Sequence, residues 1–204
     1  IAFYAYRSGN REIWAQPTSG GAARQLTHGE TESVMPRWSP DGRTIVYESR
    51  MGASSDIWVV PAAGGEARKI VGDPSADRFP DWSPDGQWLA FQSNRSGSNR
   101  IWRVPAAGGQ AEPVSKVAAF GGRWSADGKW IYFPSLEPVN IWGVSLDGRF
   151  ERPMTSLVGK RGLVDVNALS TDGKYLYFVW NEDLGDLWVM DVVQGHPEPS
   201  ERLR

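Results

Sequence analysis

The sequence contains no cysteine and only two histidines, His28 and His196. Without cysteine, the chain has no disulfide framework, no thiolate ligand for zinc and no cysteine nucleophile. Two histidines so far apart in the sequence also exclude a metal centre built from several imidazoles. These absences remove several classes of enzyme, and we expect the chain to hold neither a metal nor a cofactor.

Long apolar runs and an excess of charge of one sign are missing as well. The longest apolar run, from Tyr175 to Trp180, is far too short to span a bilayer. Lysine and arginine (22 residues) nearly balance aspartate and glutamate (24 residues), so the net charge is −2. Because binders of nucleic acids and anionic membranes normally carry a basic face, we expect no nucleic-acid partner and no membrane insertion.

Tryptophan, by contrast, is abundant, and 8 of its 11 copies fall in two motifs that recur along the chain. The first motif is W-S-P-D-G at 38–42 and 82–86, W-S-A-D-G at 124–128 and L-S-T-D-G at 169–173. The second is an Ile-Trp or Leu-Trp pair, whose tryptophans are Trp14, Trp58, Trp102, Trp142 and Trp188. Repeats of 40 to 46 residues, made of short apolar runs and turn signals, are typical of β-propellers.

Each repeat predicts four short strands. The first strand leads into Trp-Ser, Asp-Gly turns the chain tightly into the second, the Ile-Trp segment forms the third, and a short polar strand is the fourth. No segment carries a helical period. We therefore expect one domain, 1–204, with an all-β propeller fold of about five four-stranded antiparallel blades. Their predicted limits are 1–27 (partial), 28–71, 72–115, 116–157 and 158–204.

The first unit is incomplete, because it begins at its second strand, Ile1 to Tyr6, and lacks a W-S-P-D-G turn. A propeller must close its ring, since an open end exposes an unpaired strand edge and an apolar face. We therefore interpret the chain as the C-terminal portion of a larger ring, and a closed five-blade ring without one inner strand is the alternative. The open edge, Ile1 to Arg7, is expected to promote self-association. A stable, strictly monomeric product would contradict the interpretation that the chain is a portion of a larger ring.

The W-S-P-D-G turns, together with segments such as D-I-W-V-V-P-A-A-G-G at 56–65, resemble the TolB-type propeller repeat of bacteria, a WD-repeat-like group with an S-P-D-G turn. The resemblance covers essentially the whole chain and is specific for fold, but only weakly specific for function. It implies a protein-binding platform, a sensor-like domain attached to a kinase or winged-helix domain, or the gating propeller of a prolyl-oligopeptidase-like peptidase. It also implies a periplasmic or otherwise extracytoplasmic location.

The repeated aspartates and tryptophans are better explained by structure than by chemistry. The tryptophans keep a fixed phase with the blades, which predicts packing between blades rather than stacking on bases or sugars. Trp180, which adjoins a loop, is expected to be the most exposed of them. Aspartates one blade apart cannot converge on one small ligand, so each is expected to cap its own turn. These aspartates are Asp41, Asp85, Asp127 and Asp172.

Catalytic chemistry finds no support in the sequence. A serine hydrolase of the α/β type needs a G-x-S-x-G elbow and a histidine within reach, and the chain has no such elbow. His28 lies in a loop and His196 in the tail, so both are expected at the surface. The clustered carboxylates, such as Asp73, Asp77 and Asp81, lack the ligand series of an EF-hand. We therefore expect that this chain is not an enzyme.

The loops that enter each first strand and the hairpins between second and third strands share one face of a propeller, where propellers usually bind. Their charges are mixed, which suits a protein or peptide partner better than a phosphate-rich one. The candidate partner-binding residues are Glu30, Glu32, Arg50, Asp73, Asp77, Arg78, Arg95, Lys160, Arg161 and Asp165.

The preferred hypothesis is a non-catalytic protein- or peptide-binding platform, or a sensor-type propeller domain, of a bacterial multidomain or periplasmic protein. The alternative is the accessory gating propeller of a prolyl-oligopeptidase-like serine hydrolase whose catalytic domain is not in this chain. An enzyme that uses a metal in the central channel is disfavoured, because such sites need several histidine or acidic ligands.

Overall fold

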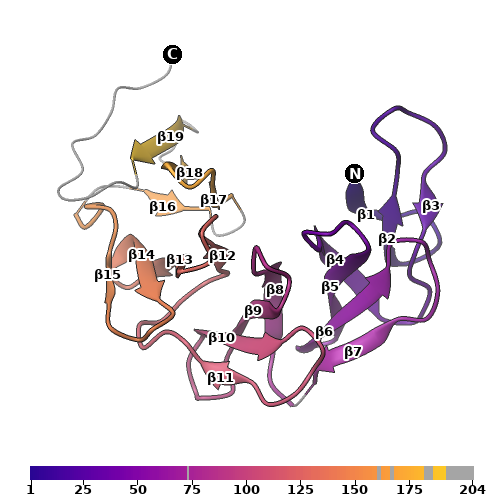
Figure 1. The fold of residues 1–204 in the computed structure, drawn as a ribbon, viewed down its shortest axis with the longest axis horizontal. Coiled ribbons are helices and arrows are strands. Elements are labelled where there is room, and N and C mark those ends of the chain that lie inside the picture. The colour runs from indigo at the N-terminus through magenta and orange to yellow at the C-terminus, as the bar shows by residue number, and fades with distance from the viewer. Residues whose placement is uncertain (73, 160–161, 166–167, 182–185, 192–204) are drawn as a thin grey trace.

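The computed structural model of the chain describes residues 1–204 except 73, 160–161, 166–167, 182–185 and 192–204. Within this part of the chain the regular elements are β-strands, and no helix occurs. The strands form five antiparallel sheets, which follow one another along the sequence and are arranged as an arc (Figure 1). The predicted all-β propeller architecture is confirmed.

The first three sheets hold β1 to β11. The first sheet consists of β1 (Ala2–Tyr6), β2 (Arg11–Ala15) and β3 (Arg24–Gln25). The second consists of β4 (Glu32–Trp38), β5 (Thr44–Met51), β6 (Ser54–Pro61) and β7 (Arg68–Val71). The third consists of β8 (Asp77–Trp82), β9 (Trp88–Ser93), β10 (Arg100–Pro105) and β11 (Glu112–Pro113).

The last two sheets hold β12 to β19. The fourth sheet consists of β12 (Arg123–Trp124), β13 (Trp130–Leu136), β14 (Val139–Ser145) and β15 (Glu151–Pro153). The fifth consists of β16 (Leu163–Val164), β17 (Ser170–Thr171), β18 (Tyr175–Asn181) and β19 (Asp186–Asp191). Its inner strand is divided, since β16 and β17 both pair with β18.

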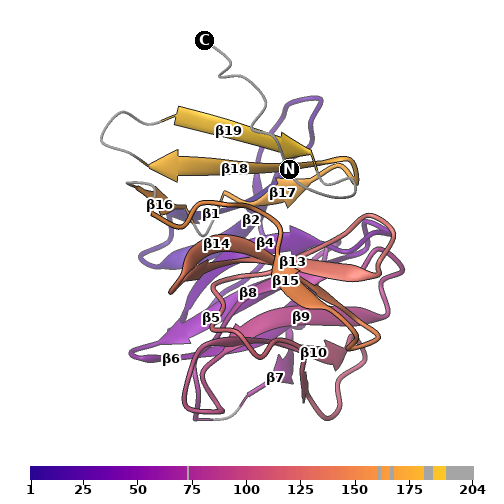
Figure 2. The same ribbon diagram turned by 90° about the vertical axis from the view of Figure 1, so that its left-hand side faces the viewer.

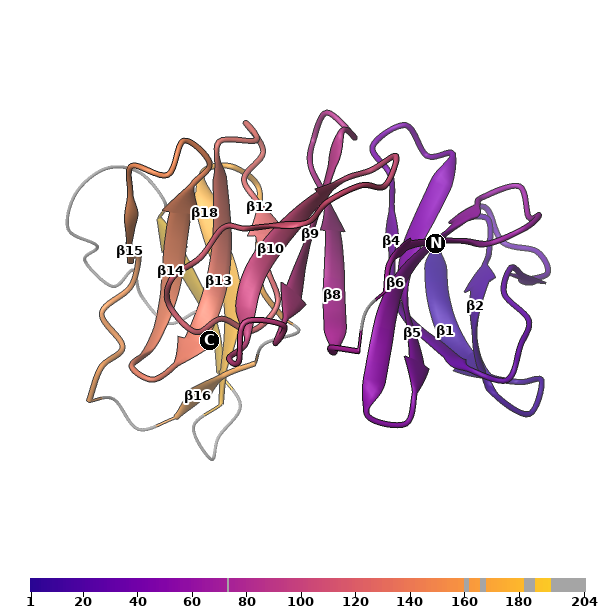
Figure 3. The same cartoon turned by 90° about the horizontal axis from the view of Figure 1, so that it is seen from below.

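The sheets are oriented alike within the arc. In the second, third and fourth sheets the first strand lies toward the inside and the last strand at the outer rim (Figure 1). Two turned views show the sheets next to one another, with their strands running between two opposite faces (Figures 2 and 3). In the described part of the chain β1 pairs only with β2, so the first sheet lacks an inner strand, as expected.

Hydrophobic cores lie between neighbouring sheets. Between the second and third sheets, Ile57 of β6 packs with Phe91 of β9, and both side chains are fully buried. Between the fourth and fifth sheets, Ile141 of β14 lies in one cluster with Phe178 of β18. A middle sheet therefore buries both of its faces, which explains the consecutive buried side chains Ile45 to Tyr47 in β5 and Leu89 to Phe91 in β9.

Each W-S-x-D-G turn is closed by its own serine and aspartate. In the turn after β8, the Ser83 hydroxyl donates to Asp85 Oδ1 (2.5 Å), and the same oxygen accepts the Gln87 N–H (3.0 Å). Aspartate is suited to this place because its short carboxylate reaches backbone N–H groups two residues on. The predicted turn role is confirmed, since the same kind of bond to a following backbone N–H occurs at Asp41, Asp127 and Asp172.

These turns make the stability of the fold sensitive to acid. The hydrogen bonds from Ser83 and from the Gln87 N–H lower the pKa of Asp85 below its usual 3.8. A lowered folded-state pKa gives stability that is present above the ordinary pKa and is lost as the pH falls through the folded value. We expect Ser83→Ala to raise the pKa of Asp85 toward 3.8, as followed by NMR titration of the carboxyl carbon. The pKa of Asp127, in the next turn, should not change, and an unchanged Asp85 would contradict the assignment.

Arginines join neighbouring sheets at the outer rim. Arg24 of β3 donates to the carbonyl oxygens of Ala62 and Ala63 in the turn after β6. One blade further on, Arg68 of β7 donates in the same way to the turn after β10, where its Nη1 lies 3.0 Å from the Ala107 oxygen. We call this arrangement, an arginine of the outermost strand bound to turn carbonyl oxygens of the next blade, the rim joint.

The prediction that Trp180 is the most exposed tryptophan is wrong, because its side chain is only 1% exposed. It packs in the last core, where Gly162 lies so close that a Cβ there would sit 2.6 Å from the indole ring. Among the described tryptophans it is Trp38 that is exposed, at 39%. Trp82, its counterpart in the next blade, donates its indole N–H to the Arg37 carbonyl of β4, the inner strand of the preceding sheet (3.2 Å). The described part of the first sheet has no inner strand that could offer Trp38 such a carbonyl.

Candidate functional site

Two kinds of loop meet on one face of the arc, as the strand order predicts. Ser55, at the start of β6, forms a bridge with Ala76, in the loop that enters β8. The Ala76 N–H in turn donates to Asn94 Oδ1 of the hairpin after β9 (2.9 Å). The loop before β4 and the end of β5 are joined in the same way, by the hydroxyls of Thr31 and Ser49 (2.9 Å). We call the surface formed by residues 26–31, 50–55, 74–78 and 94–99 the loop face.

The predicted binding residues are distributed unevenly. Glu30 is exposed, Glu32 forms an exposed ion pair with Arg11 (3.5 Å), and Asp165 is half-buried between β16 and β17. Three residues lie outside the described part of the chain, namely Asp73, Lys160 and Arg161. The structure brings the remaining four together where the second and third sheets meet, namely Arg50, Asp77, Arg78 and Arg95.

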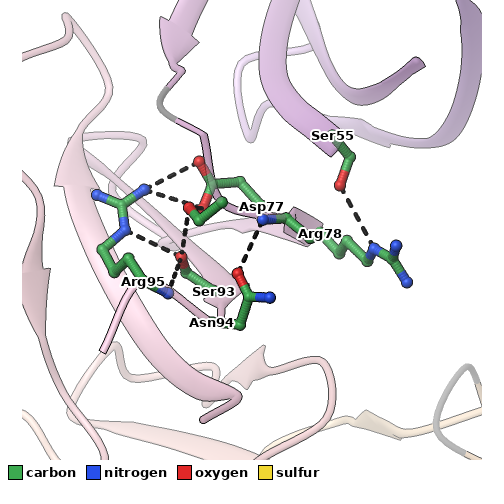
Figure 4. Close-up of polar contacts among 8 residues, drawn as sticks. Ser55, Asp77, Arg78, Ser93, Asn94 and Arg95 are labelled. Atoms are coloured by element: carbon green, nitrogen blue, oxygen red, sulfur yellow. Dashed lines mark hydrogen bonds and ion pairs between the residues drawn. The ribbon is translucent and has the colours of Figure 1, made fainter. Parts of the chain in front are cut away.

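Asp77, at the start of β8, is fully buried and holds Arg95 in place (Figure 4). Arg95 Nη2 lies 2.9 Å from each carboxylate oxygen of Asp77, and its Nε donates to Ser93 Oγ (2.9 Å). The guanidinium also lies over the rings of Phe91 and Trp102, 5.3 and 5.1 Å from their centroids. A buried carboxylate requires a counter-charge, so this pair fixes the hairpin after β9 to the start of β8.

Glu48 of β5 is a second fully buried carboxylate, and two arginines converge on it. Arg50 Nε donates to Glu48 Oε1 (2.5 Å), and the Nε of Arg78, from β8, lies 3.9 Å from the same oxygen. Arg78 Nε also donates to Ser55 Oγ (3.4 Å), and Figure 4 shows its guanidinium pointing away from the pair of Asp77 and Arg95. Two cations share one anion here, which leaves a net positive charge at this point of the loop face.

A bulge in β8 directs Arg78. The ladder between β8 and β9 shifts register just after this residue, and the next one, Phe79, has a φ of 53°. A side chain in this left-handed region costs about 1 kcal/mol or more, so the surroundings must support it. The support comes from Glu48 Oε2, which accepts the Phe79 N–H (3.4 Å). Bulges re-aim neighbouring side chains, and β4 repeats this one, with a register shift between Val34 and Arg37 and a φ of 54° at Met35.

The inner strands carry a second row of charges. Arg37, Asp81 and Arg123 occupy equivalent positions, each directly before the tryptophan of its motif. Burial raises the pKa of Asp81, and the positive charge of Arg123 opposes this effect. Burial likewise lowers the pKa of Arg123 to about 10, against the influence of Asp81, so the arginine stays charged at neutral pH. The inner wall therefore alternates positive, negative and positive charge across three blades.

Glu48 and the exposed side chains of Tyr4 and Met51 were not predicted from the sequence. Glu48 directly follows the apolar run Ile45 to Tyr47 of β5, where a buried carboxylate needs a charged partner, and this was the available signal. Tyr4 and Met51 are 43% and 73% exposed. The pKa of Arg50 is raised chiefly by its hydrogen bond to Glu48, with smaller contributions from Glu32 and Tyr4, so Tyr4 lies close to this cluster.

Chemically, the loop face offers guanidinium donors and apolar contact surface. Within the described ranges, no three His, Cys, Asp or Glu side chains are grouped so that they could hold a metal ion. None of the described segments forms a helix suited to crossing a membrane. His28 is exposed, as expected. Arginine, tyrosine and methionine at a surface are the residues that protein interfaces favour.

Comparison with known sequences gives a family match over nearly the whole chain. Residues 1–193 match the family described as the TolB beta propeller domain. A stretch of 37 residues is 51% identical to the uncharacterized peptidase YuxL of Bacillus subtilis (strain 168). This stretch amounts to 18% of the present chain and 6% of the Bacillus protein.

Solved structures share the fold at low sequence identity. A putative TolB from Agrobacterium tumefaciens is 20% identical, with a TM-score of 0.74 over 92% of this chain and 73% of that one. A puromycin-hydrolyzing peptidase from Mycobacterium tuberculosis is 17% identical, with a TM-score of 0.72 over 95% of this chain and 34% of that one. The chain thus spans about a third of the peptidase, and the similarity is one of fold.

Proposed function

The chain belongs to the TolB beta-propeller family, and on that basis we propose that it is a non-catalytic platform that binds a protein or peptide on its loop face. The observation that carries the proposal is the convergence of Arg50 and Arg78 on the buried Glu48. Side chains that are already held in place lose little conformational entropy when a partner binds. A binding or sensor domain of a bacterial multidomain or periplasmic protein fits this role, and an extracytoplasmic location, supported by the family, is part of the proposal.

A charge reversal on each face tests the proposal. Peptides that bind the chain are first selected from a random phage-displayed library. Their affinities are then measured for the parent chain and for its Arg78→Glu and Arg43→Glu variants. Arg43 is an exposed arginine of the W-S-P-D-G turn, at the opposite end of the strands. We expect Arg78→Glu to weaken the binding of the selected peptides by roughly tenfold or more, because it replaces a guanidinium of the loop face by a carboxylate, and Arg43→Glu to leave their binding unchanged. If all selected peptides bind Arg78→Glu as tightly as they bind the parent, the loop face is not the binding site.

A second candidate function is the accessory gating propeller of a prolyl-oligopeptidase-like serine hydrolase whose catalytic domain is not in this chain. The match of 37 residues to a Bacillus peptidase and the fold shared with the mycobacterial peptidase support it. It requires a neighbouring domain with a G-x-S-x-G elbow and a histidine in the same gene. Sequencing the gene beyond both ends of the chain decides this point, and a flanking kinase or winged-helix domain would favour the sensor role instead.

A further inference from the structure

We propose that Arg50 and Arg78 form a receptor for a carboxylate of the bound partner, so that the loop face selects acidic peptide segments. This inference rests on the binding role proposed above and names the chemistry of the partner. It concerns one place on the loop face, where β5 and β8 bring two guanidinium groups onto the same buried carboxylate.

Both guanidinium groups keep donors that their described contacts do not use. A guanidinium has five N–H donors, one on Nε and four on the two Nη atoms. The described hydrogen bonds and ion pairs of Arg50 and Arg78 all use Nε, toward Glu48 and Ser55. The Nη atoms of both side chains, which are 29% and 38% exposed, remain for a ligand. Such forks match a carboxylate, which accepts two parallel N–H bonds.

The charges around Glu48 favour an incoming anion. Arg50 and Arg78 share Glu48, whose side chain has no exposed surface and so cannot repel an incoming anion by direct contact. The neighbouring carboxylate, Glu32, is paired with Arg11 (3.5 Å). Among the described side chains of this cluster, one positive charge is therefore left over, and a single carboxylate from a partner would balance it.

The two guanidinium groups are oriented before a partner binds. Glu48 binds Arg50 and also accepts the N–H of Phe79, the residue that follows Arg78. One buried group thus fixes both the guanidinium from β5 and the bulge that directs the guanidinium from β8. The exposed side chain of Tyr4 near Arg50 adds contact surface, which fits a peptide segment better than a free ion.

The test compares two short peptides, acetylated and amidated at their ends, with the sequences Ala-Glu-Tyr-Glu-Ala and Ala-Gln-Tyr-Gln-Ala. Each is titrated calorimetrically into the 204-residue chain and into its Arg50→Gln, Arg78→Gln and Arg43→Gln variants. We expect the glutamate peptide to bind the parent about tenfold more tightly than the glutamine peptide. Either receptor substitution should lower its affinity by about tenfold, because charged hydrogen bonds are lost. Arg43→Gln, on the opposite face, should leave it unchanged.

Equal affinity of the two peptides would overturn the receptor, and so would equal losses in Arg43→Gln and Arg78→Gln. Thermal unfolding shows whether each variant is folded. If Arg78→Gln unfolds early, Arg78→Lys decides instead, since it keeps the charge and loses the fork, and an affinity between those of parent and Arg50→Gln is expected. Library peptides that depend on Arg78 but contain no Asp or Glu would overturn the receptor and leave the proposed binding function standing.

Discussion

Replacing Asp77 with alanine is expected to lower the free energy of unfolding by about 3 kcal/mol. The substitution leaves the guanidinium of Arg95 without the carboxylate that lies 2.9 Å away, although this side chain is only 18% exposed. The arginine cannot easily turn into water, because Ser93 binds its Nε and the rings of Phe91 and Trp102 lie against it. Since a domain is typically stable by about 5–15 kcal/mol, such a loss is a large fraction of the total. Urea denaturation measures it.

Two further variants show how much of the loss comes from the contact between Asp77 and Arg95. In the double variant Asp77→Ala with Arg95→Met, the cost should be smaller than the sum of the single costs by about 1–3 kcal/mol, because the two side chains bind each other directly. Glu112→Ala is the matched control, since it breaks the more exposed ion pair with Arg103 (2.5 Å) and should cost under about 1 kcal/mol. Equal costs for Asp77→Ala and Glu112→Ala would contradict the role given to Asp77.

The second large effect is expected at Trp124, where substitution by alanine should cost about 4 kcal/mol. Its side chain is 6% exposed and belongs to the core between the third and fourth sheets. Trp38, at the same position of its motif, is 39% exposed and borders a hollow of about 450 Å³ with Ile1 and Ala62. Because Trp38 is less buried and its neighbours can relax into that space, Trp38→Ala should lower the free energy of unfolding by about half as much, about 2 kcal/mol.

Urea denaturation of both variants at several protein concentrations checks this difference. A second copy of the chain that pairs with the free edge of β1 would cover Trp38, so the two costs should converge as the concentration rises if the chain self-associates there. Equal costs at low concentration, where the chain is monomeric, would contradict the inequality of the two tryptophans.

The fold could be predicted from the sequence because its information is local and repeated. The turn at Asp85 needs only the serine two residues before it and the N–H of Gln87, all within one motif. The strands alternate with such turns at a fixed period, so one correct unit predicts the others. The missing inner strand of the first sheet followed from the same period.

The details of the candidate site depend on contacts between blades, which the period does not encode. The sequence placed Asp77 and Arg95 on one face, but their pairing depends on the register of β8 against β9. The pair of Glu48 and Arg50 lies within one strand, but the second arginine at Glu48, Arg78, comes from the next blade and could not be placed from the sequence. Trp180 was misjudged for a different reason, since its burial depends on a loop of its own blade that a glycine lets approach.

The rim joint bears on how such a chain could grow by duplication. One blade supplies an arginine to the blade after it and turn carbonyls to the blade before it, so a gene segment for a single blade encodes both halves of the contact. A tandem copy therefore fits its neighbours without further change. The third blade has diverged from this pattern. Glu112 occupies the position of the arginine in its outer strand, and the third and fourth blades are joined instead by Glu151, which accepts the Lys116 N–H (2.8 Å).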